Sequence, residues 1–311
     1  MTTRIAVLPP TVSGRQVSSD VIGEKRHMRV VMPLFGLTYK GNRFQFSDNY
    51  SLEHFNYEKD VPQELAGLSE IDVSHLSLEN WAIVADNPSE GYRSEINLLL
   101  MALRIYAQSN TFIKWRFCDE DSGNFSRIGS DMRFSNLAIT SSRIIEESGL
   151  STVRDGFLNL LEMNQISDRT KNALYFVWRG LCSGKHIDAY IFLVCALEAL
   201  FSNETPEDAT KTLIKRIQKF LSGIKGFGGD QVKRIYKIRS DMVHGRIPHT
   251  DKDSEQAKQN IKNLGKLELL VFTCIKKILD EKIYLLYKDI DEKEKFLNSL
   301  MKAYKRIRID P

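Results

Sequence analysis

The stretch QVKRIYKIRSDMVHGR, residues 231–246, decides how the rest of this chain is interpreted. Its apolar residues fall mostly on one face at helical spacing, which predicts a single helix. Gly245 follows the last periodic residue, where a left-handed cap is expected, and Pro248 prevents the helix from resuming at once. We therefore expect a helix that places His244 in its last turn.

Arg239 and His244 are the residues of this helix that could carry chemistry. The carbonyl end of a helix favours a protonated imidazole at His244. At about 100° per residue the two side chains lie about 140° apart, so they share no narrow stripe, although both could border a cleft facing a second helix. The spacing by itself arises by chance roughly one time in three in a chain of this composition. A surface arginine with a capping histidine is the alternative.

Length and composition are those of a soluble globular protein with one large or two ordinary domains. The chain has 311 residues, of which 42% are hydrophobic and 27% charged. MTTRIAVLPP lacks the apolar core of a signal peptide, and the longest apolar run, 190–201, is too short to cross a bilayer. Four scattered cysteines favour reduced thiols over disulfides or a metal site. We expect a cytoplasmic protein without membrane association, metal or cofactor.

The net charge of +4 is divided unevenly along the chain. Residues 1–166 carry 16 Lys and Arg against 21 Asp and Glu, a net of −5, whereas residues 167–311 carry 28 against 19, a net of +9. A basic half is typical of proteins with a phosphate-bearing partner, although solvated lysine-rich helices give the same count.

The first part of the chain predicts a small α+β domain over residues 1–150. Alternating or buried apolar segments predict strands over 28–35, 42–46, 81–85, 111–117 and 134–140, and one helix is expected over 93–108. Pro33 places the first strand at an edge or at a break. We find no metal-ligand spacing, nucleophile elbow or Walker loop in this part.

From residue 151 the pattern becomes helical. A helix over 151–164 is expected to bridge to an all-helical bundle over 165–311. The helix over 187–201 is apolar on nearly all sides and should be the central one. It contains Glu198, which needs a partner. That partner could be a basic residue of a neighbouring helix, or Glu198 could orient Arg239 or His244.

Two segments of this bundle, IFLVCALEALFSN and KRIYKIRSDMVHGR, are separated by a basic helix and a glycine-containing loop. In this combination the chain resembles the HEPN superfamily, and more narrowly the ApeA-like HEPN domains of bacterial abortive-infection proteins, over about residues 165–285. The resemblance implies a helical bundle that forms a homodimer, metal-independent RNA cleavage, and a role in anti-phage defence. It also implies that Arg239 and His244 of both subunits meet at the dimer cleft. Ser240 departs from the Asn, Asp or His that active relatives often have there.

These residue types suit RNA cleavage, because RNA supplies its own nucleophile in the 2′-hydroxyl. The reaction then needs a base, an acid and positive charge on the phosphorane. We expect His244 to handle protons and Arg239 to stabilise charge. Ser240, Glu198 and Asp241 are candidate supporting residues, although for Asp241 we favour an exposed helix charge. Basic residues expected to guide the RNA backbone are Lys215, Arg216, Lys219, Lys233, Arg234, Lys237 and Arg246.

Two other functions remain open from the sequence. The bundle could be a non-catalytic HEPN-like module for dimerisation or for binding nucleic acid or a nucleotide. The chain could also be a sensor or adaptor whose acidic N-terminal domain binds an activating ligand or a protein. A regulatory N-terminal domain is compatible with either.

Overall fold

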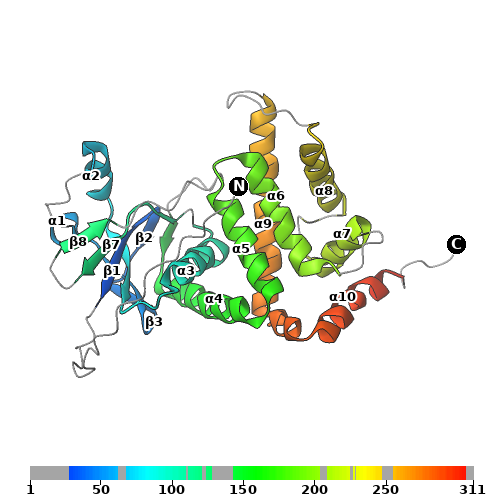
Figure 1. Cartoon of the computed structure of the whole chain (residues 1–311), viewed down its shortest axis with the longest axis horizontal. Helices are drawn as coiled ribbons and strands as arrows, with labels where there is room; N and C mark the ends of the chain where they lie inside the picture. The colour runs from blue at the N-terminus through cyan, green and yellow to red at the C-terminus, as the bar shows by residue number, and fades with distance from the viewer. Residues whose placement is uncertain are drawn as a thin grey trace, which may run out of the picture.

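The computed structural model describes residues 28–61, 68–109, 111–120, 124–127, 143–203, 209–224, 227, 229–246 and 255–305. Within these ranges an antiparallel sheet comes first and a mostly helical part follows (Figure 1). The expectation of an α+β region ahead of a helical one is confirmed at this level. The strand expected over 134–140 lies outside the described residues.

The main sheet of the N-terminal region pairs its strands antiparallel. In spatial order the strands are β3 (Arg43–Ser47), β4 (Tyr50–His54), β5 (Trp81–Asp86), β1 (Arg29–Phe35), β7 (Phe117–Glu120) and β8 (Asn124–Arg127), with β6 (Phe112–Ile113) also paired to β1. A separate parallel pair is formed by β2 (Leu37–Tyr39) and β9 (Arg143–Ile145). The single strand expected over 111–117 is wrong, because β6 and β7 are separate strands.

Strand β1 lies inside the sheet although it contains Pro33. On one side it pairs with β5 along residues 29–33. On the other side β7 pairs with residues 29–31 and β6 with residues 34 and 35. Pro33 therefore lies where the partner strand changes, and the interrupted ladder tolerates a residue without an N–H. The sequence suggested that Pro33 places this strand either at the edge of the sheet or at a break. The break is observed, and the edge position is wrong.

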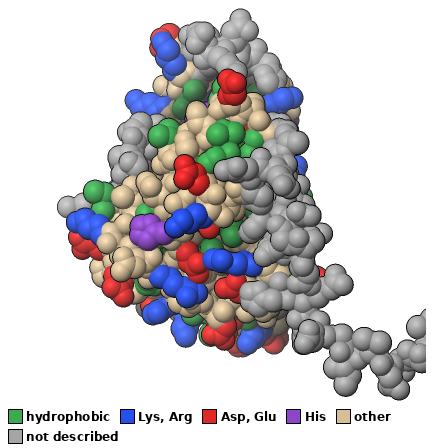
Figure 2. All heavy atoms as spheres, turned by 90° about the vertical axis from the view of Figure 1, so that its left-hand side faces the viewer, with side chains coloured by type: hydrophobic (Ala, Val, Ile, Leu, Met, Phe, Trp, Pro, Cys, Tyr) green, Lys and Arg blue, Asp and Glu red, His purple; other side chains and the backbone are tan. Residues whose placement is uncertain are grey.

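The two faces of the sheet pack into different cores. Val30, Met32 and Leu34 of β1 belong to the main core, and the alternate residues Val31 and Phe35 belong to a smaller one. Helices α1 (Tyr57–Asp60) and α2 (Glu70–Leu76) lie at the smaller core, to which α2 contributes its buried Leu76. At this outer end of the molecule, Lys and Arg are interspersed with Asp and Glu (Figure 2). The excess of Asp and Glu in the N-terminal part therefore does not form an acidic patch on the visible part of this face.

Two helices connect the sheet to the helical part. α3 (Tyr92–Ala107) packs against α4 (Glu147–Ile166), which also contacts β3, α5 (Asp168–Cys182) and α9 (Glu255–Asp280). α4 begins before the expected bridging helix 151–164 and ends after it. A Cβ on Gly156 would lie 2.1 Å from the Tyr106 ring of α3, so this glycine permits the close approach of the two helices.

The helical part is arranged around α6 (His186–Phe201). α6 contacts α5 (Asp168–Cys182), α7 (Ala209–Phe220), α8 (Gly229–Val243) and α9 (Glu255–Asp280) (Figure 1). The last described elements are η1 (Ile283–Lys288) and α10 (Ile290–Lys305). One continuous apolar core runs from the sheet through α3 and α4 into this part. Within the described ranges, no helix has the length and apolarity that crossing a bilayer requires.

Candidate functional site

Helix α8 is held in place by one apolar side. Val232, Ile235, Tyr236 and Met242 are buried on it, and α8 contacts α6 and α7. The Tyr190 hydroxyl of α6 donates a 3.0 Å hydrogen bond to the carbonyl oxygen of Ile235. This contact joins the central helix to a backbone group of the helix that carries the candidate site.

The end of α8 has the hydrogen bonds of a Schellman motif. Gly245 has φ +68°, its N–H donates to the Met242 carbonyl at 3.1 Å, and the N–H of Arg246 donates to the Asp241 carbonyl at 2.8 Å. The left-handed glycine expected from the sequence is therefore present. His244 is the last residue before this turn, and its side chain is exposed.

Arg239 faces α6 rather than open solvent. Its Nη2 lies 3.8 Å from Oε1 of Glu198, and the two side chains are 36% and 34% exposed. Burial raises the pKa of Glu198, and the positive charge of Arg239 opposes that rise. The buried Nε of Arg239 has no hydrogen-bond partner among the described residues. Glu198 thus has the basic neighbour that its apolar helix required.

His244 lies on a different side of α8 from Arg239. Residues 233, 237, 240 and 244 recur at the spacing of one helix face, so His244 shares a stripe with Lys233, Lys237 and Ser240. Both lysines are exposed and Ser240 is half-buried. Asp241 accepts a 3.1 Å hydrogen bond from Arg246 Nη1. Asp241 is therefore paired with Arg246, and no side-chain hydrogen bond to His244 is found in the described part of the chain.

The seven basic residues expected to guide RNA are not equally accessible. Lys233, Arg234, Lys237 and Arg246 are exposed, and Lys215 and Lys219 are half-buried. Arg216 is only 3% exposed, and its Nη1 donates a 2.9 Å hydrogen bond to the Phe201 carbonyl at the end of α6. In this structure Arg216 is engaged inside the fold, so we remove it from the surface set.

Two residues that the sequence did not single out lie beside the Arg239–Glu198 pair. Cys195 precedes Glu198 by one turn of α6, and burial followed by the charge of Glu198 raises its thiol pKa. Tyr236 precedes Arg239 by three residues, and its buried hydroxyl has no hydrogen-bond partner within the described ranges. Burial raises the pKa of Tyr236 well above its ordinary value. Each residue lies three positions before a member of the pair in its own helix, and this spacing was the signal in the sequence that could have identified it.

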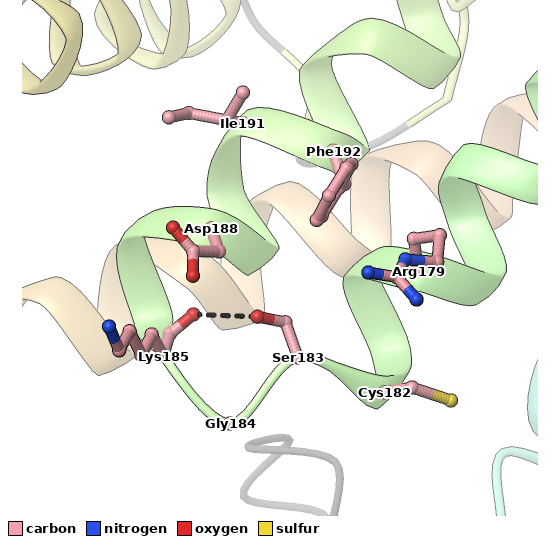
Figure 3. Close-up of a pocket in the computed structure, with 8 residues that line it drawn as sticks. All are labelled: Arg179, Cys182, Ser183, Gly184, Lys185, Asp188, Ile191 and Phe192. Carbon is pink, nitrogen blue, oxygen red and sulfur yellow. Dashed lines mark hydrogen bonds between the residues drawn. The ribbon is translucent and has the colours of Figure 1, made fainter. Parts of the chain in front are cut away.

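A pocket of about 480 Å³ lies at the opposite end of α6, around the loop that joins α5 to α6 (Figure 3). The Arg179 guanidinium carbon lies 5.5 Å from the centre of the Phe192 ring, and Ser183 Oγ donates a 3.2 Å hydrogen bond to the Lys185 carbonyl. Asp188 also lines this pocket. None of the site residues expected from the sequence contributes to it.

Comparisons with known proteins add no relative, since no protein-family model, curated protein or solved structure matches this chain.

Proposed function

We propose that this protein is a metal-independent endoribonuclease of the HEPN type, which cleaves RNA through its 2′-hydroxyl at a cleft between two copies of the chain. Its proposed setting is anti-phage abortive infection. The observation that carries the proposal is the end of α8. An exposed histidine there shares a stripe with two exposed lysines, one turn beyond an arginine held beside a carboxylate.

Each of these groups has a defined part in the proposed reaction. His244 exchanges protons with the 2′-hydroxyl or the leaving 5′-oxygen, for which an exposed imidazole is suited near neutral pH. Arg239 stabilises the phosphorane, because a planar guanidinium can contact two phosphate oxygens. Glu198 positions Arg239 from the neighbouring helix. Lys233 and Lys237 hold the RNA backbone along the same stripe as His244.

A second copy is needed because one chain does not direct both groups to one phosphate. Arg239 is turned toward α6, whereas His244 faces outward. Near Arg239, α6 leaves Cys195 and Ala199 partly exposed, and Val243 of α8 is 53% exposed. A helix that is apolar on nearly all sides is normally covered on all of them. A two-fold dimer through this face would cover it and supply two histidines and two arginines to one cleft.

The first experiment measures cleavage of single-stranded RNA in EDTA. Arg239→Ala and His244→Ala should each reduce the rate by at least about a hundredfold, the usual scale for a positioned acid or base. Arg154→Ala and His75→Ala are matched controls, because both residues are outside the site. Cleaved ends should carry 2′,3′-cyclic phosphates. Wild-type rates in His244→Ala would disprove the assignment of His244.

A mixing experiment tests the shared cleft. Subunits carrying Arg239→Ala and subunits carrying His244→Ala are each expected to be inactive alone. Mixed dimers retain one intact arginine and one intact histidine from different chains, so activity should return in part. No recovery, with mixed dimers confirmed by mass, would contradict a cleft built by both subunits. RNA binding without cleavage by the wild type would instead support a non-catalytic binding module.

A further inference from the structure

A second, smaller pocket opens beside α8. It has a volume of about 220 Å³ and lies between α6, α8 and the part of α9 that carries Asn263 and Lys266. That volume is below the roughly 300–1,000 Å³ of sites that enclose a whole drug-sized ligand. The pocket is therefore of a size to take one flat ring system rather than a complete nucleotide.

The floor of this pocket is apolar and fixed. Tyr190, Ile235 and Ile238 line it. The bond from the Tyr190 hydroxyl to the Ile235 carbonyl holds the two helices together at this point. Tyr190 and Ile235 are buried, and Ile238 is partly exposed at the opening. A flat, uncharged ring can pack against such a surface without loss of a hydrogen bond.

Amide groups form the polar edge of the pocket. Asn263 of α9 is 7% exposed, and its Oδ1 accepts a 2.9 Å hydrogen bond from Gln259 Nε2. This bond orients the amide and leaves its Nδ2 as a donor. Gln231 of α8 offers a second amide across the opening. Asparagine and glutamine amides are the side chains that read base edges, because they pair a donor with an acceptor.

Two cations and one carboxylate flank the opening. Arg234, Lys266 and Asp230 line the pocket, and all three are exposed. An apolar floor, an amide edge and a rim of net positive charge together match an unpaired base with its attached phosphate. Ile238 precedes His244 by six residues, which is about 9 Å of helix rise and about 120° of rotation around α8. A strand with a base in this pocket and a phosphate at His244 would therefore curve around the helix between nearby nucleotides.

We propose that this pocket receives one unpaired base of the RNA next to the cut, and that Asn263 and Gln231 determine which base is accepted. The inference rests on the proposed ribonuclease function and adds to it a source of sequence preference. Arg234 and Lys266 hold the adjoining phosphate, so they contribute affinity without discriminating between bases.

The test sequences the ends produced from a random single-stranded RNA pool in EDTA. The wild type should prefer one base at a fixed offset from the cut. Asn263→Ala and Gln231→Ala should each weaken that preference by about tenfold, the scale of a lost base-edge contact. Lys266→Ala should slow cleavage of all sequences alike. Lys171→Ala, which removes an exposed lysine of α5, is the charge-matched control and should change neither quantity.

A binding measurement covers the case in which Asn263→Ala disturbs folding. In the His244→Ala protein, nucleoside 5′-monophosphates should shift NMR signals of Gln231 and Lys266, and ribose 5-phosphate, which lacks a base, should shift them less. An unchanged cut-site preference in folded Asn263→Ala and Gln231→Ala would overturn the pocket assignment while cleavage itself persisted. Absence of cleavage by the wild type would overturn the proposed function, and this inference with it.

Discussion

Gly245 determines where His244 is presented. Its φ of +68° lies in the left-handed region, and among the described residues no atom outside its immediate chain neighbours lies within 4 Å of a Cβ built there. The requirement for glycine is therefore conformational rather than steric. Through the bonds to Met242 and Asp241, this residue ends α8 and leaves the imidazole outside the helix.

Substituting Gly245→Ala should lower the free energy of unfolding by about 1 kcal/mol, because a Cβ disfavours positive φ. Chemical denaturation measures the change. Gly265 in the interior of α9 is the control, since a Cβ there meets no atom of the described part of the chain within 4 Å and its φ is not positive. Gly265→Ala should raise the free energy of unfolding by roughly 0.5–1 kcal/mol. A destabilising Gly265→Ala or a neutral Gly245→Ala would contradict this account.

At the scale of the element, α8 has two sides with different roles. The buried side anchors the helix and directs Arg239 to Glu198 of α6. The exposed side carries His244, Lys233 and Lys237 in one stripe, within residues 205–250, which hold 10 Lys and Arg against 4 Asp and Glu. Only the exposed side is free to contact a long polyanion within one chain.

Removing the two lysines of this stripe should change how RNA binding depends on salt. Each phosphate contact on a single strand contributes about 0.7 to the slope of log affinity against log salt. The double variant Lys233→Ala, Lys237→Ala should therefore reduce the magnitude of that slope by about 1.4, as measured by fluorescence anisotropy across salt concentrations. Lys171→Ala should leave the slope unchanged. An unaltered slope in the double variant would remove the stripe from the RNA path.

At the scale of the whole molecule, the sheet region and the bundle meet around a buried arginine and a buried glutamate. Arg104 of α3 and Glu268 of α9 are each 1% exposed. Arg104 donates its Nε and Nη2 to the Thr111 carbonyl at 3.4 Å. Burial raises the pKa of Glu268 to about 8, although the positive charge of Arg104 acts in the opposite direction. This joint between the two parts is therefore sensitive to pH.

The sign of that sensitivity follows from proton binding. Between pH 4.5, the ordinary value for glutamate, and about 8, the unfolded chain has lost the Glu268 proton while the folded chain retains it. This contribution to stability is complete below pH 4.5 and is lost as pH rises to 8, by at most about 1.4 kcal/mol per unit. Glu268→Gln should remove this loss, and exposed Glu90→Gln should not. If wild type and Glu268→Gln differ in free energy of unfolding by the same amount at every pH from 4 to 9, the pKa of Glu268 is not raised by folding, and this account is wrong.

The sequence by itself determined the local structure. Periodic apolar residues predicted the helix over 187–201, one residue shorter than α6, and turn residues predicted the end of α8, because helix period and the left-handed preference of glycine act within a few residues. The need of Glu198 for a partner was also visible, since an acid in an apolar helix must be compensated. The resemblance to HEPN domains named Arg239 and His244, and their roles remain predictions.

Only the tertiary structure decided which groups meet. Partner strands divided 111–117 into β6 and β7 and allowed Pro33 inside the sheet, because pairing is set by distant segments. Packing buried Arg216 against the end of α6, directed Arg239 to Glu198 and placed Asn263 opposite α8. Helical spacing gives the direction in which a side chain points from the helix axis. Which residue it meets in that direction depends on how separate helices pack, and the packing depends on residues throughout the chain.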